Sequence, residues 1–319
     1  MPTLPELKDY ELLGRLAVGG MAEIYRARAL SGAVPGEEVV LKRLLPLHRA
    51  DPAYVELFLA EARLGVLVAH PNIVRTYDLL RVGRDYFIVQ ELVGGDTVGN
   101  LAARARALGG RLSLEAGLVA VVDLLEALRH LHSGAGVPGQ PPIIHRDVNP
   151  LNLVASPEGI AKLIDFGIAE RLGSAVRDRT GALRGTPAYM SPEQVKGRVA
   201  LDPRSDLFSA GIVLWELVAN LPLFRHDNEF ETLRQVAEVG APPLRSVLPQ
   251  APAVFERLCV RALAPDRDRR FQSAGEFLHG LREACQREGL GLDRALLGAE
   301  VRRLSPGAPR VKASRVRAG

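Results

Sequence analysis

Cysteine is scarce in this sequence of 319 residues. Its two cysteines, Cys259 and Cys285, are not arranged in a C-x-x-C spacing, and both lie in apolar patterns typical of helices. We therefore expect two buried, inert thiols rather than a disulfide or a redox pair. Such thiols fit a reducing cytoplasm.

Long apolar runs are also missing. No stretch approaches the ~18 consecutive apolar residues of a membrane-spanning helix; the apolar stretch 119–125 is interrupted by Asp123. The N-terminal residues, MPTLPELKDYELL, lack a basic segment followed by an apolar one. We therefore expect no signal peptide and no transmembrane segment, and a cytoplasmic location.

Acidic residues are absent from positions 301–319, which carry six of the 41 basic residues. The remaining 35 basic residues face 37 acidic ones, so the rest of the chain has a net charge of −2 and the net charge of +4 comes from the tail. No specific nucleic-acid-binding surface is expected. Residues 305–319, rich in Gly, Pro and Arg, have little to bury and are predicted to be flexible.

Polar side chains with a common chemistry are concentrated in the middle of the chain. The sequence IIHRDVNPLN places Asp147 and Asn152 just after an apolar pair, and Asp165 follows a second apolar run. Two carboxylates and an amide at strand–loop junctions can hold a divalent cation and orient a hydroxyl. Mg²⁺ prefers such oxygen ligands and commonly shares them with phosphate oxygens.

The pattern H-R-D-x-x-x-x-N followed by D-F-G resembles the protein kinase family, in particular its bacterial serine/threonine members. The resemblance extends from about Tyr10 to about Ala284. It implies an α+β, two-lobed fold, with a small antiparallel sheet lobe that includes one helix and a larger, mainly helical lobe. The implied divisions are an N-terminal extension at 1–9, the small lobe at 10–91, the large lobe at 92–287, and a helix remnant with a basic flexible tail at 288–319.

The resemblance also implies roles for individual residues. Asp147 would orient the acceptor hydroxyl, Lys42 would contact the nucleotide phosphates, and Glu61 would pair with Lys42. Asn152 and Asp165 would hold Mg²⁺, with Mn²⁺ as a second candidate metal. The residues expected to contact ATP are Leu16, Gly19, Ile24, Val40, Lys42, Glu91, Val93 and Val154.

Other matched positions are expected to support or regulate the site. Arg146 would pair with a phosphate on Thr180, and Thr186 would lie beside Asp147 in the segment GTPAYMSPE, which resembles the substrate-docking segment of Ser/Thr kinases. Asp206 is expected to bond the backbone of the H-R-D loop. Two further pairs are expected, Arg270 with Glu193 and His145 with Phe166.

Four positions depart from the family pattern. Ala17 and Ala22 replace two glycines of the loop that covers the phosphates, and Gly65 replaces an apolar residue in a helix, which suggests a looser helix. Asn149 stands where the family usually has lysine, so one positive charge near the transferred phosphoryl group is missing. The expected result is a slow kinase whose turnover rises in Asn149→Lys. Two alternatives stay open: another cation such as Arg184 supplies the charge, or the loop is built around asparagine.

The favoured function is transfer of the γ-phosphate of ATP to Ser or Thr hydroxyls of a protein, with a transient homodimer for autophosphorylation. A pseudokinase scaffold is the alternative that Ala17, Ala22 and Asn149 support. A kinase of small molecules is the third, and the docking segment argues against it because a small substrate needs no such platform.

Overall fold

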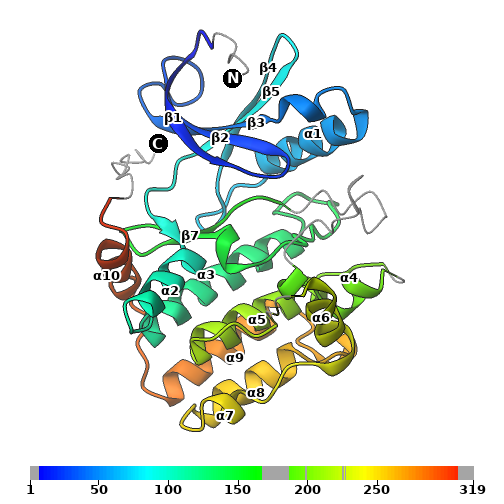
Figure 1. The fold of residues 1–319 in the computed structure, drawn as a ribbon, viewed down its shortest axis with the longest axis vertical. Helices are drawn as coiled ribbons and strands as arrows, with labels where there is room; N and C mark the ends of the chain where they lie inside the picture. Colours follow the sequence, from blue (N-terminus) through cyan, green and yellow to red (C-terminus); the bar gives the residue numbers. More distant parts are fainter. Residues whose placement is uncertain (1–6, 167–186, 198–199, 225, 227, 308–319) are drawn as a thin grey trace. The chain divides into compact units, whose positions relative to one another are not determined.

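The computed structural model describes residues 7–166, 187–197, 200–224, 226 and 228–307. They form two compact units, each drawn in Figure 1. The first contains the chain up to Ala69 together with Val74–Gly94. The second contains His70–Ile73 and the chain from Gly95 through the last helix.

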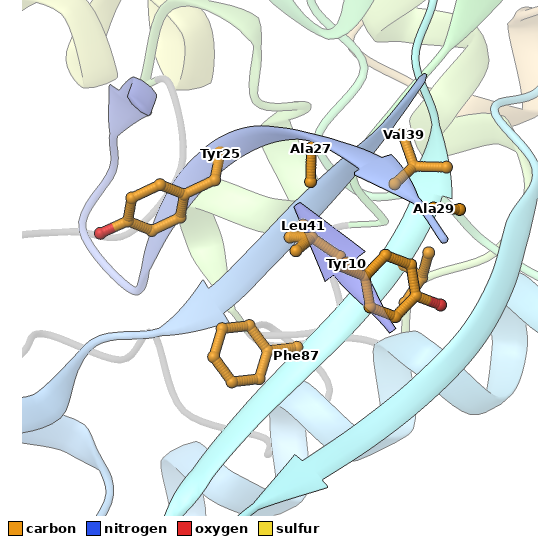
Figure 2. Close-up of a cluster of buried hydrophobic side chains, with 8 residues drawn as sticks. Tyr10, Tyr25, Ala27, Ala29, Val39, Leu41 and Phe87 are labelled. Carbon is orange, nitrogen blue, oxygen red and sulfur yellow. The ribbon is translucent and has the colours of Figure 1, made fainter. Parts of the chain in front are cut away.

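The first unit is an antiparallel sheet with strand order β1-β2-β3-β5-β4. Its elements are β1 (Tyr10–Val18), β2 (Ala22–Ala29), β3 (Glu38–Leu44), the short helix η1 (Pro46–His48), α1 (Pro52–Leu67), β4 (Thr76–Val82) and β5 (Asp85–Glu91). Figure 2 shows a cluster of buried side chains from four of these strands, with Tyr10, Leu41 and Phe87 drawn close together. Burial of this apolar cluster stabilises the sheet at about 25 cal/mol per Å².

Helix α1 begins where the sequence predicts. Asp51 is its N-cap, its side chain accepts a hydrogen bond from Ala53 N at 3.0 Å, and Pro52 occupies the first turn. Phe58 and Ala62 of the helix are buried against strand residues. This contact fixes the face of α1 that is turned to the sheet.

The second unit is mainly helical, with a three-stranded sheet of order β6-β7-β8. Its strands are β6 (Asp96–Thr97), β7 (Leu153–Ala155) and β8 (Ala161–Leu163). Its helical elements are α2 (Val98–Ala107), α3 (Leu114–His132), η2 (Pro150–Asn152), η4 (Pro187–Tyr189), α4 (Pro192–Lys196), α5 (Arg204–Ala219), α6 (Glu229–Arg234), the π-helical turn η5 (Gln235–Val239), α7 (Leu244–Val247), α8 (Ala253–Ala262), η6 (Arg267–Arg269), α9 (Ala274–Arg287) and α10 (Arg294–Leu304).

Helices α3 and α5 form the centre of this unit. Ser113 caps α3 as predicted, and its side chain accepts from Ala116 N at 3.2 Å. Most side chains of α5 are buried, and α3 packs against both α5 and α9. These features confirm the α+β class with a sheet lobe and a larger helical lobe.

Both cysteines are free and buried, as expected, with Cys259 in α8 and Cys285 in α9. Burial raises the pKa of both thiols, that of Cys285 to about 11. Neither is therefore a reactive thiolate near neutral pH. Among the helices that the model describes, none is both long and apolar enough to cross a membrane.

Candidate active site

The carboxylate of Asp147 lies in a loop that holds it from both sides. Its Oδ1 accepts a hydrogen bond from Asn149 Nδ2 at 3.0 Å, and its Oδ2 accepts one from Asn152 Nδ2 at 2.8 Å. Both amides also donate to the carbonyl oxygen of Asp147, at 3.2 and 2.9 Å. Asp147 is therefore fixed in position while it remains partly exposed.

Asn149 has a structural role in this loop. It is the N-cap of η2, and its Oδ1 accepts from Leu151 N at 2.9 Å and from Asn152 N at 3.1 Å. Its side chain is therefore engaged at both ends, and the residue is only 3% exposed. This geometry favours a loop built around asparagine over a loop that lacks a lysine.

Asn152 and Asp165 lie near each other because a tight hairpin joins them. Strands β7 and β8 pair with Leu153 opposite Leu163, and Ile164 N donates to Asn152 O at 2.9 Å. Asp165 has φ +53°, in the left-handed region that few residues other than glycine adopt. Such backbone strain, about 1–3 kcal/mol per residue, is common where a functional side chain must be aimed.

Residues 145–152 form the catalytic loop, and the segment before Asp165 is hydrogen-bonded to it. His145 Nε2 donates to Ile164 O at 3.1 Å, and the ring packs against Phe166 with centroids 5.7 Å apart. The expected packing of His145 on Phe166 is thus present. The same ring accepts at Nδ1 from Asp147 N, at 3.3 Å.

Asp206, in the first turn of α5, fixes the backbone of the catalytic loop. It accepts from His145 N and Arg146 N, each at 2.8 Å, as predicted. A third partner, His132 Nε2 at 2.8 Å, comes from the end of α3 and was not foreseen. Burial by itself would raise the pKa of Asp206, but the hydrogen bonds and positive charge of these partners lower it overall.

Lys42 and Glu61 are brought together in the first unit, from β3 and α1. Lys42 Nζ lies 2.6 Å from Glu61 Oε1. Their residues are 7% and 4% exposed. A charged pair this deeply buried needs close contact to offset desolvation, so the geometry agrees with the predicted pairing.

The residues expected to contact the nucleotide divide between the units. In the first, Ile24 faces Lys42 across the β2–β3 pair, and Val40, two residues before Lys42, lies on the same face. Leu16 is on β1 and Gly19 N closes the following turn by donating to Ala22 O at 2.8 Å.

The remaining expected nucleotide contacts lie at the ends of strands. Glu91 ends β5 and its N–H already donates to Arg75 O at 2.9 Å, so this N–H is not available to a ligand. Val93 follows β5 in the same unit, and Val154 lies on β7 of the second unit.

A steric constraint, which the sequence could not show, explains why position 65 is a glycine. A Cβ at this position of α1 would overlap the side chain of Thr76 on β4. The hydroxyl of Thr76 in turn accepts from Gln90 Nε2 at 3.4 Å. Gly65 therefore allows a close approach of helix and strand, which is a tighter arrangement than the looser helix that we expected.

The predicted regulatory threonines cannot be placed, since Thr180 and Thr186, like Arg184, lie outside the described residues. Arg146 can be placed. It has φ +71°, and its carbonyl accepts from Gln194 Nε2 at 2.8 Å. Gln194 belongs to a capping box that begins α4, which the sequence S-P-E-Q signals.

The expected pair of Arg270 and Glu193 is present, with two hydrogen bonds of 2.7 and 2.8 Å. Burial by itself would raise the pKa of Glu193, but Arg270 lowers it overall. The pair connects the start of α4 to the segment between η6 and α9.

A groove of about 830 Å³ begins at the catalytic loop, within the second unit. Pro150 and Leu151 form one side, and Leu151 is half exposed. Tyr189 of η4 and Glu216 of α5 line it further on, joined by a 2.6 Å hydrogen bond from the Tyr189 hydroxyl. The groove is large enough to take several residues of an extended chain.

The side-chain oxygen atoms of Asn152 and Asp165 fit magnesium. In the part of the chain that the model describes, no cluster of three or more His, Cys, Asp or Glu side chains could hold a metal. Asp165 and Asn152 supply one carboxylate and one amide oxygen. The Nδ2 of Asn152 is committed to Asp147, which leaves its Oδ1 as the atom for a cation. Mg²⁺ is commonly bound by one or two such groups together with substrate phosphates.

Comparison with known proteins agrees with this geometry. The sequence model of the protein kinase domain family matches residues 10–280 of this chain. A tyrosine-protein kinase, MasK of Myxococcus xanthus, is 33% identical over 303 residues, which cover 94% of this chain and 46% of MasK.

Other relatives are named as serine/threonine kinases. A probable serine/threonine-protein kinase PknB of Bifidobacterium longum is 34% identical, covering 87% of this chain and 40% of its own length. The serine/threonine-protein kinase PknA of Mycobacterium tuberculosis is 32% identical, covering 84% of this chain and 59% of its own length. The chain thus spans about half the length of the curated relatives that it matches. It belongs to the protein kinase family.

Proposed function

We propose that the chain is an active protein serine/threonine kinase that transfers the γ-phosphate of ATP to a protein hydroxyl. The observation that carries the proposal is the way Asn149 and Asn152 hold both carboxylate oxygens of Asp147. A scaffold without catalysis would gain nothing from orienting this carboxylate. The buried pair of Lys42 and Glu61 supports the same reading.

The roles follow from the chemistry of each group. Asp147 accepts a hydrogen bond from the acceptor hydroxyl and orients it toward the γ-phosphorus. It takes up the hydroxyl proton as the new P–O bond forms and the bond between the γ-phosphorus and the bridging oxygen of ATP breaks, which releases ADP. Lys42 supplies a positive charge to the phosphates, and Glu61 holds its ammonium in place. Asn152 and Asp165 would hold Mg²⁺, which neutralises phosphate charge when bound.

The acceptor is expected to be a Ser or Thr in an extended segment lying in the groove beside Leu151. Relatives named as serine/threonine kinases favour this acceptor. The name of MasK favours tyrosine instead, and it is the specific reason to test a second candidate function. The two free, buried cysteines support a location in the reducing cytoplasm, and autophosphorylation would proceed in a transient homodimer.

The test is incubation with labelled ATP, Mg²⁺ and a basic protein, followed by phosphoamino acid analysis. We expect phosphoserine and phosphothreonine from the wild type and a loss of at least a hundredfold in Asp147→Asn. Glu158→Gln is the matched control, because it makes the same change at an exposed carboxylate that lies outside the site. Phosphotyrosine as the only product would mean that the acceptor is tyrosine. Equal labelling by the wild type and Asp147→Asn would support a pseudokinase.

A further inference from the structure

The tip of the β1–β2 hairpin, residues 19–21, is held by the segment that follows β3. Leu45 N donates to Met21 O at 2.9 Å, and Nε2 of His48 lies 3.0 Å from Gly20 O. Since a carbonyl oxygen carries no proton, Nε2 of His48 is the donor of this hydrogen bond. Among the described residues, His48 is the only one whose side chain bonds the backbone of the tip.

The imidazole ring of His48 is itself held in place. It stacks on the ring of Tyr54, with centroids 3.8 Å apart and planes 8° from parallel. Tyr54 lies in the first turn of α1, the helix that carries Glu61. The hairpin tip is therefore connected to α1 through two side chains, and the stacking keeps Nε2 of His48 directed at the tip.

The contact with His48 sets the direction of a backbone N–H. The peptide bond between Gly20 and Met21 is trans, so its C=O and its N–H point in opposite directions. Because the Gly20 carbonyl points at His48, the N–H of Met21 points away from it. In the part of the chain that the model describes, this N–H has no acceptor. Gly20 is an exposed glycine, so without His48 this peptide group would be free to rotate.

We propose that His48 is a positioning residue for the nucleotide, because it aims the N–H of Met21 at a phosphate oxygen of ATP. This role rests on the proposed function, in which the hairpin covers the phosphates of ATP. The N–H of Met21 donates a charge-assisted hydrogen bond to the phosphate, whereas His48 acts through the peptide group and does not touch the nucleotide. A peptide group that is fixed before binding loses less backbone entropy when the phosphate arrives.

The N–H of Met21 can be observed directly by NMR of the full chain. The sequence contains three methionines, Met1, Met21 and Met190, and Met1 carries an amine in place of an amide. A sample labelled with [¹⁵N]methionine therefore gives two amide signals, which Met190→Leu assigns. The probes are ATP with Mg²⁺ and adenosine, which has the same base and ribose but no phosphate. We expect ATP to shift the Met21 signal saturably, and adenosine to leave it in place.

Two variants separate the hydrogen bond from the stacking. His48→Phe keeps a flat ring for Tyr54 but has no donor. We expect it to bind ATP about five- to thirtyfold more weakly, the cost of ordering the backbone of one residue, and to bind adenosine as the wild type does. His48→Gln retains an N–H donor and should restore most of the affinity for ATP. His279→Phe is the matched control, because it makes the same change at an exposed histidine of α9.

Four outcomes would overturn the role of His48: a Met21 signal that ATP does not shift, undiminished ATP binding by His48→Phe, an equal loss of ATP and adenosine binding in that variant, or the same loss of ATP binding in His48→Gln. The equal loss would mean that His48 only supports the structure. Binding requires no phosphoryl transfer, so a chain that binds ATP as expected but labels no protein would refute the proposed function and leave this role of His48 standing.

Discussion

Replacing Asn149 by lysine tests whether the catalytic loop is built around the asparagine. From the sequence, the added charge was expected to raise turnover. In the structure, the side chain of Asn149 makes four hydrogen bonds, two as acceptor from the η2 backbone and two as donor to Asp147. A lysine has no acceptor, so it cannot cap η2.

The magnitudes decide which effect dominates. Loss of an N-cap costs about 1 kcal/mol. The N–H of Leu151 loses its partner, which costs about 1–3 kcal/mol if it stays unsatisfied, whereas the N–H of Asn152 keeps its hydrogen bond to the backbone carbonyl of residue 149. Because Asn149 is 3% exposed, a lysine in its place must either bury its ammonium or move its side chain out of the position that Asn149 occupies. We expect Asn149→Lys to lower the free energy of unfolding by about 1–3 kcal/mol. We expect turnover to fall by roughly ten- to a hundredfold, since Asp147 loses a positioning contact.

Asn149→Ser is the matched variant. A serine retains an oxygen that can cap η2, but it has no amide to donate to Asp147. Its stability should therefore lie closer to that of the wild type, while its turnover falls. The measurements are steady-state kcat and KM for ATP with one peptide, together with urea unfolding of all three proteins.

The result that refutes the reasoning is a lysine variant with higher turnover and unchanged stability. That result would mean that the ammonium reaches the transferred phosphoryl group, where one such stabilising group can contribute about 2–4 kcal/mol. It would also mean that the loop holds Asp147 without Asn149.

Three further predictions concern the two units. Lys42→Met should lose phosphoryl transfer by at least a hundredfold, and its melting temperature should fall because the buried carboxylate of Glu61 loses its cation; retained activity would contradict the role of this ammonium. Gly65→Ala should destabilise the protein by about 1–3 kcal/mol in urea unfolding, because the overlap with Thr76 outweighs the ~1 kcal/mol gain in helix propensity. Burial lowers the pKa of His70 and His130, whose rings stack 4.8 Å apart, below the usual 6.5. Their neutral forms thus favour folding above pH 6.5, and melting curves should show stability lost as the pH falls from 6.5 to 5, with a smaller loss in His130→Phe.

Local sequence patterns predicted much of the fold. Asp51 before Pro52 and Ser113 before an apolar helix both marked helix starts correctly, because a cap bonds a backbone N–H two or three residues away. Asn149 before Pro150 is the same pattern, and it could have been read as a cap had the resemblance to a lysine position not taken its place.

Contacts between distant residues could not be predicted in this way. Thr76 lies against Gly65 only because α1 packs on β4, and His132 reaches Asp206 across 74 positions of sequence. The family pattern supplied the pair of Lys42 and Glu61, but no local signal connects a strand lysine to a helix glutamate 19 residues later. Such pairs depend on tertiary packing, which the sequence specifies only as a whole.

Helix α10 lies in the segment 288–319, which the resemblance implied to be a helix remnant with a basic tail, and it is part of the second compact unit. The family match ends at residue 280, and the sequence suggested only a helix remnant after 287. In the structure, Arg294 of α10 pairs at 2.9 Å with the buried Asp123 of α3.

The other carboxylate oxygen of Asp123 accepts from Ala161 N of β8 at 2.8 Å. Gly298 and Gly159 permit the backbones of α10 and the β7–β8 turn to meet, since a Cβ on either would overlap a carbonyl oxygen of the other segment. Burial raises the pKa of Asp123, which shows that its charge is costly where it lies. Without α10 that carboxylate would lose its cation. Because β7 and β8 also hold Asn152 and Asp165 in place, α10 is part of the framework on which the site depends.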